Sequence, residues 1–265
     1  MFPAASFAPF NSIIVGCIAA TLLACSVNAQ SKPSSPQTAE SRVDSEPEAQ
    51  ATEKTEAKEV EPPKSLPEPK GLVRMNPKDE VWIDMKKKRV VVGGRIALNR
   101  GMLEMFACPK GTKEHESVVS VNALAQTVHA ALLAIGAKSG KPAQYDPEYK
   151  PASGDVIQVT VLWEDEQGKP HNIQAQQWIR QVKTKKPMSH QWVFAGSGFW
   201  KDEDTGREHY LAESGELICV SNFSTATMDV NVESSQSNAG LLFEAWTERI
   251  PPLGAPVRLV LEVAK

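Results

Sequence analysis

The sequence predicts an α+β domain, a mainly antiparallel sheet with one principal helix packed on it. Three observations predict this class: short runs of alternating apolar residues, turns rich in Gly, Pro and Asp between them, and a single stretch with helical periodicity. Many antiparallel strands with one main helix place that helix over one face of the sheet. We expect one such domain over residues 71–265, because about 195 residues are enough for a single good core.

The strands are expected from period-two alternation and from the turn residues between the runs. A basic turn at 86–88, for example, joins two β-like runs into a predicted hairpin. The expected strands and strand pairs cover 81–92, 95–106, 155–174, 191–220 with a hairpin loop at 202–206, and 257–263.

One segment has clear helical periodicity. Asn122 is placed to cap this helix and Gly136 to end it. The apolar residues that share one face of the helix are Leu124, Val128, Ala131, Leu132 and Ile135. A second, shorter helical turn is expected at 241–248, before two consecutive prolines.

Residues 1–29 have the features of an export signal peptide. They carry no charged side chain, and their apolar run at 13–24 has the length of a signal core but is too short to span a membrane. Residues 22–25 (LLAC) resemble a bacterial lipobox, in which the cysteine thiol takes up the lipid, so Cys25 is the expected lipidation site. The alternative is a soluble secreted product that is cleaved after Ala29.

Residues 30–70 are expected to form a disordered tether. They contain nine acidic and six basic residues, many prolines and few large apolar side chains. Such a segment cannot bury enough apolar surface to offset the entropy lost on ordering. We expect it to hold the domain away from a membrane surface, with a neutral linker as the alternative.

The folded part is electrically neutral, since residues 71–265 contain 23 acidic and 23 basic side chains. Most nucleic-acid-binding proteins obtain their affinity from a clustered excess of Lys and Arg. We therefore expect no nucleic-acid partner.

Residues 108–117 (CPKGTKEHES) contain the most chemically reactive side chains. One interpretation makes Cys108 a nucleophile with His115 as its base, and another makes His115 and Glu116 metal ligands. No third ligand is spaced to identify a zinc site, so we expect no metal and no cofactor. In an exported protein the simplest use of Cys108 and Cys219 is a disulfide, with inert buried thiols as the alternative.

Trp192, Phe194 and Trp200 are expected on one side of a strand, with Gly196 and Gly198 between them. We expect these rings in the core, because glycines allow a large ring to cross a neighbouring strand. The alternative is a stacking platform for a sugar or a peptide.

Two stretches resemble the YdjY-like family of exported bacterial proteins. They are 106–119, which includes Cys108, His115 and Glu116, and 129–136 (HAALLAIG). The segments 192–198 (WVFAGSG) and 219–222 (CVSN) are similar to planctomycete members of that family. The resemblance covers roughly residues 72–265. It implies an exported domain and brings no established activity.

We therefore expect a membrane-tethered lipoprotein of the cell envelope that faces the periplasm or the outside. Its domain has a non-catalytic binding or structural role. The membrane is an expected partner through the lipid on Cys25, and the sequence does not identify the protein or small-molecule partner. The alternative is an exported enzyme or metalloprotein that uses the loop containing Cys108, His115 and Glu116.

Overall fold

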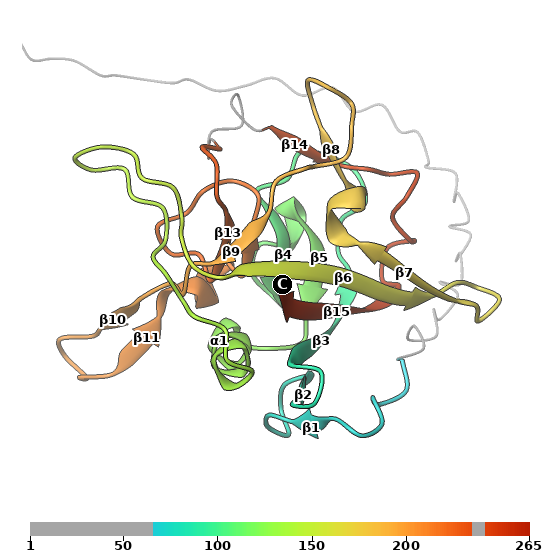
Figure 1. Cartoon of the computed structure of the whole chain (residues 1–265), viewed down its shortest axis with the longest axis horizontal. Coiled ribbons are helices and arrows are strands. Elements are labelled where there is room, and N and C mark those ends of the chain that lie inside the picture. The colour runs from blue at the N-terminus through green and yellow to red at the C-terminus, as the bar shows by residue number, and fades with distance from the viewer. Residues whose placement is uncertain (1–65, 235–241) are drawn as a thin grey trace, which may run out of the picture. The chain divides into compact units, whose positions relative to one another are not determined.

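The computed structural model describes residues 66–234 and 242–265 (Figure 1). They belong to one compact unit. The predicted signal peptide and most of the predicted tether lie outside the described residues. The elements are β1 (Val73–Arg74), β2 (Val81–Asp84), β3 (Arg89–Ile96), β4 (Met105–Pro109), η1 (Glu114–Glu116), β5 (Ser117–Val121), α1 (Ala125–Ala134), β6 (Val156–Glu164), β7 (Pro170–Gln174), η2 (Ala175–Trp178), β8 (Ile179–Gln181), β9 (Trp192–Phe194), β10 (Phe199–Lys201), β11 (Glu208–Tyr210), η3 (Leu211–Ser214), β12 (Ile218–Cys219), β13 (Met228–Val230), β14 (Phe243–Ala245) and β15 (Pro256–Val263).

Eight strands form a closed barrel. Their order around the barrel is β3, β15, β6, β9, β13, β12, β4 and β5, and β5 pairs with β3 to close it. Neighbouring strands are antiparallel except for two parallel pairs, β12 with β13 and β4 with β5. β2 and then β1 extend the sheet beyond β3, and β7 extends it beyond β6.

The predicted fold class, a mainly antiparallel sheet with one principal helix packed on it, is therefore wrong. The molecule is mostly β, and α1, of ten residues, is the one α-helix among the described residues. The barrel closes because one edge of β3 serves two partners: residues 89–92 pair with β2, and residues 94–96 pair with β5.

Gly94 explains how β5 can approach β3 so closely. It lies opposite Val121 where β3 changes partner. A Cβ atom at Gly94 would lie 2.6 Å from the carbonyl oxygen of Ser120 and 3.1 Å from Cγ1 of Val119. The missing side chain makes room for this strand pairing.

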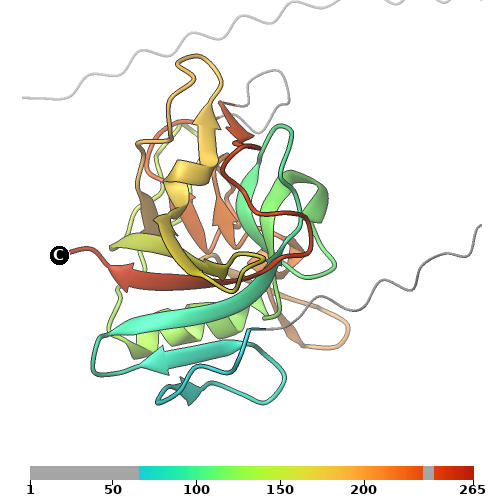
Figure 2. The same ribbon diagram turned by 90° about the vertical axis from the view of Figure 1, so that its right-hand side faces the viewer.

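Three local predictions are confirmed. β2 and β3 form the expected hairpin, β6 and β7 form another, and β15 is the expected last strand. β15 pairs with β3 on one side and β6 on the other, through seven residue pairs each. Figure 2 shows this red strand between the teal β3 and the olive β6.

Three other local predictions need correction. No hairpin forms over 95–106, because β3 pairs with β5 while β4 pairs with β5 and β12. Within 191–220 only β10 and β11 form the expected hairpin, and β9 pairs with β13 instead. The helical turn expected at 241–248 is replaced by strand β14.

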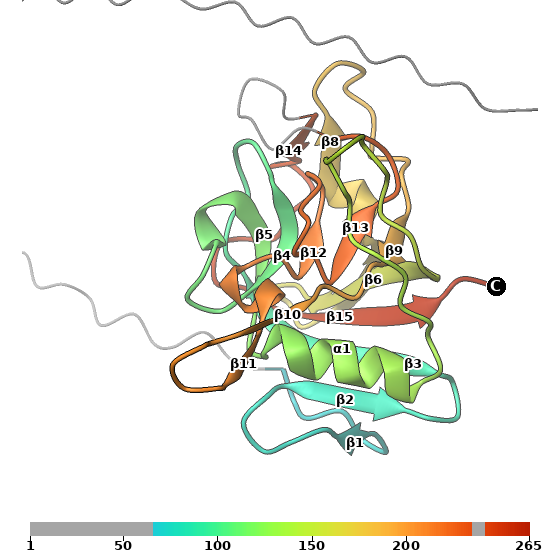
Figure 3. The ribbon, with the colours of Figure 1, turned by 90° about the vertical axis from the view of Figure 1, so that its left-hand side faces the viewer.

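The helix is confirmed in its position and in most of its buried face. Val128, Ala131 and Leu132 are buried, whereas Leu124 is exposed. Gly136 follows the helix with a φ of +92°, a conformation that favours glycine. Figure 3 shows α1 beside β2 and β3. Among the helices of the described ranges, none has the length and apolar composition that crossing a membrane requires.

The helix cap differs from the prediction. Asn122 is bound to the sheet, where its backbone N–H donates to the carbonyl of Gly93 at 2.9 Å. Two N–H groups of the first turn, which have no acceptor within the helix, bind Glu213 from η3. Its carboxylate accepts from Ala125 N at 3.0 Å and from Gln126 N at 2.8 Å. A carboxylate at this end of a helix is also favoured by the helix dipole.

The core of the barrel contains large aromatic and aliphatic side chains. The largest fully buried rings are Trp178, Trp192, Phe106, Phe194 and Phe243. A second, smaller cluster of Trp82, Val91 and Val260 lies on the other face of β2, β3 and β15, where Leu72 and Leu162 pack against it. This outer face is important for the site described below.

Candidate functional site

Cys108 is buried within β4 and is not activated as a nucleophile. Its side chain has no solvent exposure, and this burial raises the pKa of the thiol. A neutral thiol is a poor nucleophile. His115 does not provide a base for it, since the side chain of His115 is 78% exposed on η1 and no hydrogen bond joins the two residues in the described structure.

Glu116 takes part in an ion cluster around Lys113 that sequence reasoning did not identify. Lys113 Nζ lies 3.0 Å from Glu216, 3.7 Å from Glu116 and 4.0 Å from Glu104. It also lies 4.4 Å from the ring centroid of Phe223. The expected partner His115 contributes only a 3.9 Å contact between its Nε2 and Glu116.

The charges in this cluster are unequal, with three carboxylates against one ammonium group. Burial and the neighbouring Glu116 raise the pKa of Glu104. Burial alone would lower the pKa of Lys113, but Glu216, Glu116 and Glu104 together outweigh burial and raise it. Lys113 thus stays charged and stabilises the carboxylates around it.

Lys113→Met is expected to destabilise the protein by about 2 kcal/mol at pH 7.5 and by less at pH 5. Methionine keeps the packing on Phe223 but leaves three carboxylates without a cation, and protonation at low pH relieves their repulsion. Urea denaturation at both pH values measures this. Lys110→Met, at an exposed position of the same loop, serves as the control. An equal loss at both pH values would show that packing rather than charge is responsible.

Cys108 and Cys219 are both buried free thiols in the structure. Cys219 packs in a cluster with Met105 and Ala226. Burial raises the pKa of Cys219 well above its ordinary value. Neither thiol is therefore set up for nucleophilic chemistry.

Asn222, at the end of the CVSN segment, belongs to a buried polar network. Its Nδ2 donates to Asp229 Oδ1 at 3.1 Å, and its Oδ1 accepts from Ser234 N at 2.7 Å. Asp229 also accepts from the backbone N–H groups of Phe223 and Val230 at 3.1 and 2.7 Å. These bonds fix the loop between β12 and β13, so we assign this segment a structural role.

The aromatic residues of 192–200 divide between two locations. Trp192 and Phe194 are completely buried, as expected for core residues. Trp200 is 53% exposed and lies on the β10–β11 hairpin, not on the same strand. In the loop of that hairpin Asp202 Oδ1 accepts from the N–H groups of Asp204 and Thr205, both at 2.9 Å. The expected hairpin tip is thus present.

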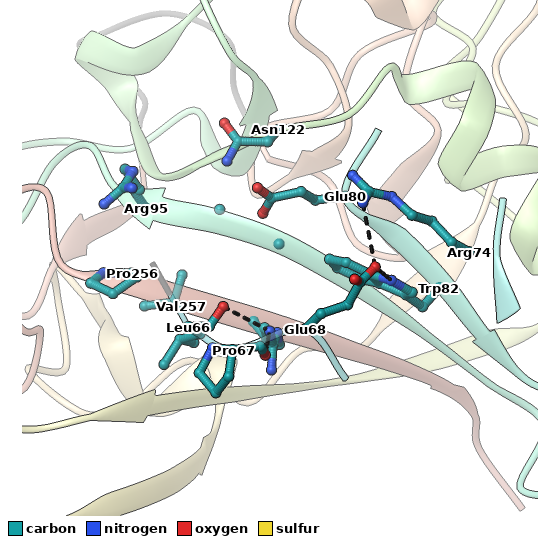
Figure 4. Close-up of a pocket in the computed structure, with 13 residues that line it drawn as sticks. Leu66, Pro67, Glu68, Arg74, Glu80, Trp82, Arg95, Asn122, Pro256 and Val257 are labelled. Atoms are coloured by element: carbon teal, nitrogen blue, oxygen red, sulfur yellow. Dashed lines mark hydrogen bonds and ion pairs between the residues drawn. The ribbon is translucent and has the colours of Figure 1, made fainter. Parts of the chain in front are cut away.

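A pocket of about 280 Å³ lies on the outer face of β2, β3 and β15 (Figure 4). We call it the Trp82 pocket. Its walls come from the strands β2, β3 and β15, from β1 and from the segment 66–68. The lining residues are Leu66, Pro67, Glu68, Arg74, Glu80, Trp82, Gly93, Gly94, Arg95, Asn122, Pro256, Val257 and Arg258.

The Trp82 ring lies near two guanidinium groups. Arg74 Cζ is 5.3 Å and Arg258 Cζ is 5.6 Å from the ring centroid, within the range of cation–π attraction. Burial lowers the pKa of Arg258, and the nearby carboxylate of Glu80 opposes this shift. The side chain of Glu80 lies over Gly93, where a Cβ atom would collide with it.

Residues 66–70, which we call the entry segment, lie across one side of this pocket. Glu68 Oε1 accepts from Trp82 Nε1 at 3.1 Å and from Arg74 Nη1 at 3.3 Å. Arg258 Nη2 donates to the carbonyl oxygen of Leu66 at 3.3 Å and to that of Pro67. Figure 4 shows Leu66, Pro67 and Glu68 on one side of β3, with Glu80, Arg95 and Asn122 toward the other side.

Sequence reasoning missed this site. Two signals were present: Trp82 alternates with the inward-facing Val81 and Ile83, and two adjacent glycines interrupt the apolar strand β3. Both indicate a close approach on the outer face. No sequence spacing links Arg74 to Arg258, however, because they come from opposite ends of the domain.

Across the described ranges, no three His, Cys, Asp or Glu side chains converge in a way that could hold a metal ion. A family model described as the YdjY domain matches residues 81–262. Comparison with curated proteins and with solved structures gave no match.

Proposed function

The chain belongs to the YdjY family, and we propose that it is an exported lipoprotein whose barrel serves as a binding domain in the cell envelope. The sequence of residues 22–25 (LLAC) supports the lipid anchor, and the composition of 30–70 supports a spacer between anchor and domain. Several acyl chains on Cys25 provide stable membrane attachment, which a single chain does not.

The Trp82 pocket is the observation that carries the binding role. It is concave, and it combines an aromatic surface with a few convergent polar groups, as ligand sites do. Arg74 and Arg258 supply charged donors, and the indole N–H of Trp82 supplies a neutral one. Guanidinium groups are well suited to carboxylate ligands.

Recognition is better supported than catalysis by the positions of the reactive side chains. Cys108 and Cys219 are buried with raised thiol pKa values, and His115 is exposed on a separate loop. None of the three lines the Trp82 pocket. Glu116 instead belongs to the ion cluster around Lys113, which stabilises the fold.

Cys25→Ser is expected to shift the protein from the membrane fraction to the soluble fraction, because serine cannot accept the lipid thioether. Fractionation followed by immunodetection measures the shift, and globomycin, which blocks lipoprotein processing, should leave the signal peptide attached. Cys17→Ser, a second cysteine in the same leader, is the matched control and should stay with the membrane. Unchanged fractionation of Cys25→Ser, or a cytoplasmic product that keeps Met1, would contradict the proposal.

A further inference from the structure

We propose that the Trp82 pocket recognises an extended peptide with a glutamate between prolines, and that the entry segment fills part of this site in cis until such a peptide displaces it. The inference rests on the proposed binding role and names the ligand class for that same site.

The entry segment itself shows which ligand chemistry fits. Arg258 binds two main-chain carbonyl oxygens, those of Leu66 and Pro67, and every extended peptide offers such groups. Trp82 and Arg74 bind the single carboxylate of Glu68. Prolines on both sides of Glu68, at 67 and 69, favour an extended backbone and lack N–H groups that would need partners. An acidic sugar has no counterpart of the two successive peptide carbonyls.

The entry segment is held by contacts that are easily exchanged. No strand pairing is present over residues 66–70. The Glu68 and Arg74 side chains are 63% and 36% exposed, and ion pairs at such exposure contribute little. Trp82, in contrast, is buried at 4% exposure. If the entry segment leaves, the indole ring becomes accessible and its N–H becomes available to a ligand.

The pocket and the entry segment also differ in whether the family model covers them. Trp82 and Arg258 lie within the matched range 81–262, whereas the entry segment and Arg74 lie before it. A cavity of about 280 Å³ remains beside the segment. Trp82 and Arg258 thus belong to the family domain, and the pocket leaves room for a ligand larger than the segment.

A titration of the full chain with the labelled peptide KSLPEPK, the sequence of residues 64–70, tests the proposal by fluorescence anisotropy. A segment linked in cis competes at an effective concentration of about 1 mM, so the wild type should bind weakly. Glu68→Ala weakens the competitor, and this chain should bind the peptide about tenfold more tightly. Glu166→Ala, an exposed acid in the β6–β7 turn, is the matched control and should bind as the wild type does.

Two further titrations make the ligand class falsifiable. In the Glu68→Ala chain, Arg258→Lys should weaken binding about tenfold, because lysine cannot reproduce the planar guanidinium contacts. The peptide KSLPQPK should bind about tenfold less tightly than KSLPEPK. Circular dichroism verifies that each variant is folded.

Equal affinities of the wild-type and Glu68→Ala chains for KSLPEPK would overturn the inference. Binding of trigalacturonate in place of the peptide would overturn it as well, while leaving a binding role for the pocket. The membrane anchoring in the proposed function is judged by the Cys25→Ser fractionation, so failure of one experiment is distinguishable from failure of the other.

Discussion

Gly94→Val is expected to open the barrel between β3 and β5 and to lower the free energy of unfolding by about 3 kcal/mol or more. The added side chain would collide with the Ser120 carbonyl oxygen, which is only 2.6 Å from the position of a Cβ atom. Since this oxygen belongs to the backbone of β5, the strand must move as a whole. The barrel then loses the pairing that closes it.

Urea denaturation followed by tryptophan fluorescence measures this loss, because the domain contains all six tryptophans. Gly94→Ala should give a smaller loss of the same kind. Gly198→Ala is the control, since a Cβ atom there approaches only the end of the Leu211 side chain, at 3.3 Å. Wild-type stability of Gly94→Val would show that the contact between β3 and β5 does not maintain the fold.

Asp229→Ala is expected to destabilise the protein by about 3 kcal/mol. The substitution removes the side-chain acceptor of the backbone N–H groups of Phe223 and Val230. It also removes one acceptor of Asn222 Nδ2, which still donates to the Val230 carbonyl oxygen at 3.1 Å. Each N–H group left without an acceptor incurs the full cost of losing water. Thermal and urea denaturation measure the effect, and Asp204→Ala at the exposed β10–β11 tip is the control.

Asp229→Asn tests the protonation state of the same side chain. Burial raises the pKa of Asp229 to about 8, although the three donors oppose this. The unfolded carboxyl group titrates near pH 4, so the folded state holds the proton more tightly between about pH 4 and 8. The stabilisation that this proton gives to the wild-type fold is therefore fully present below about pH 4. It is lost as the pH rises toward 8.

The asparagine variant does not titrate, and its amide nitrogen cannot accept one of the three hydrogen bonds. We expect it to be about 2 kcal/mol less stable than the wild type at pH 5. The difference should fall by about 1.4 kcal/mol per pH unit and reverse in sign before pH 8. Urea denaturation of both proteins at pH 5, 6, 7 and 8 measures this difference. The other titrating groups are the same in both proteins, so their contributions to the free energy of unfolding cancel. A difference that grows with pH would show that Asp229 is ionised in the native protein.

The sequence predicted those parts of the fold that depend on neighbouring residues. The β2–β3 and β6–β7 hairpins follow from alternation around short turns, and α1 follows from its apolar face. Closure of the barrel could not be predicted in this way, because the contact of Gly94 with Val121 and the parallel pairing of β12 with β13 depend on the whole sheet curling. The cap of α1 was missed for the same reason: Glu213 reaches it from a distant part of the chain.

The candidate site shows the same division. Cys108 and His115 attracted attention because they are close in sequence, yet one is buried in a strand and the other is exposed on a 3₁₀ turn. The pocket residues Arg74, Trp82 and Arg258 are brought together only by the pairing of β1, β2, β3 and β15. The signal peptide, Cys25 and the tether lie outside the described residues and stay predictions.

The central position of β15 affects when the domain can fold during biosynthesis. This strand pairs with β3 on one side and with β6 on the other. In the sequence, its residues 256–263 are separated from β3 by most of the domain. A nascent chain whose residues 256–263 are still inside the ribosome cannot complete the barrel. Until this strand is available, the edges of β3 and β6 that it joins stay unpaired.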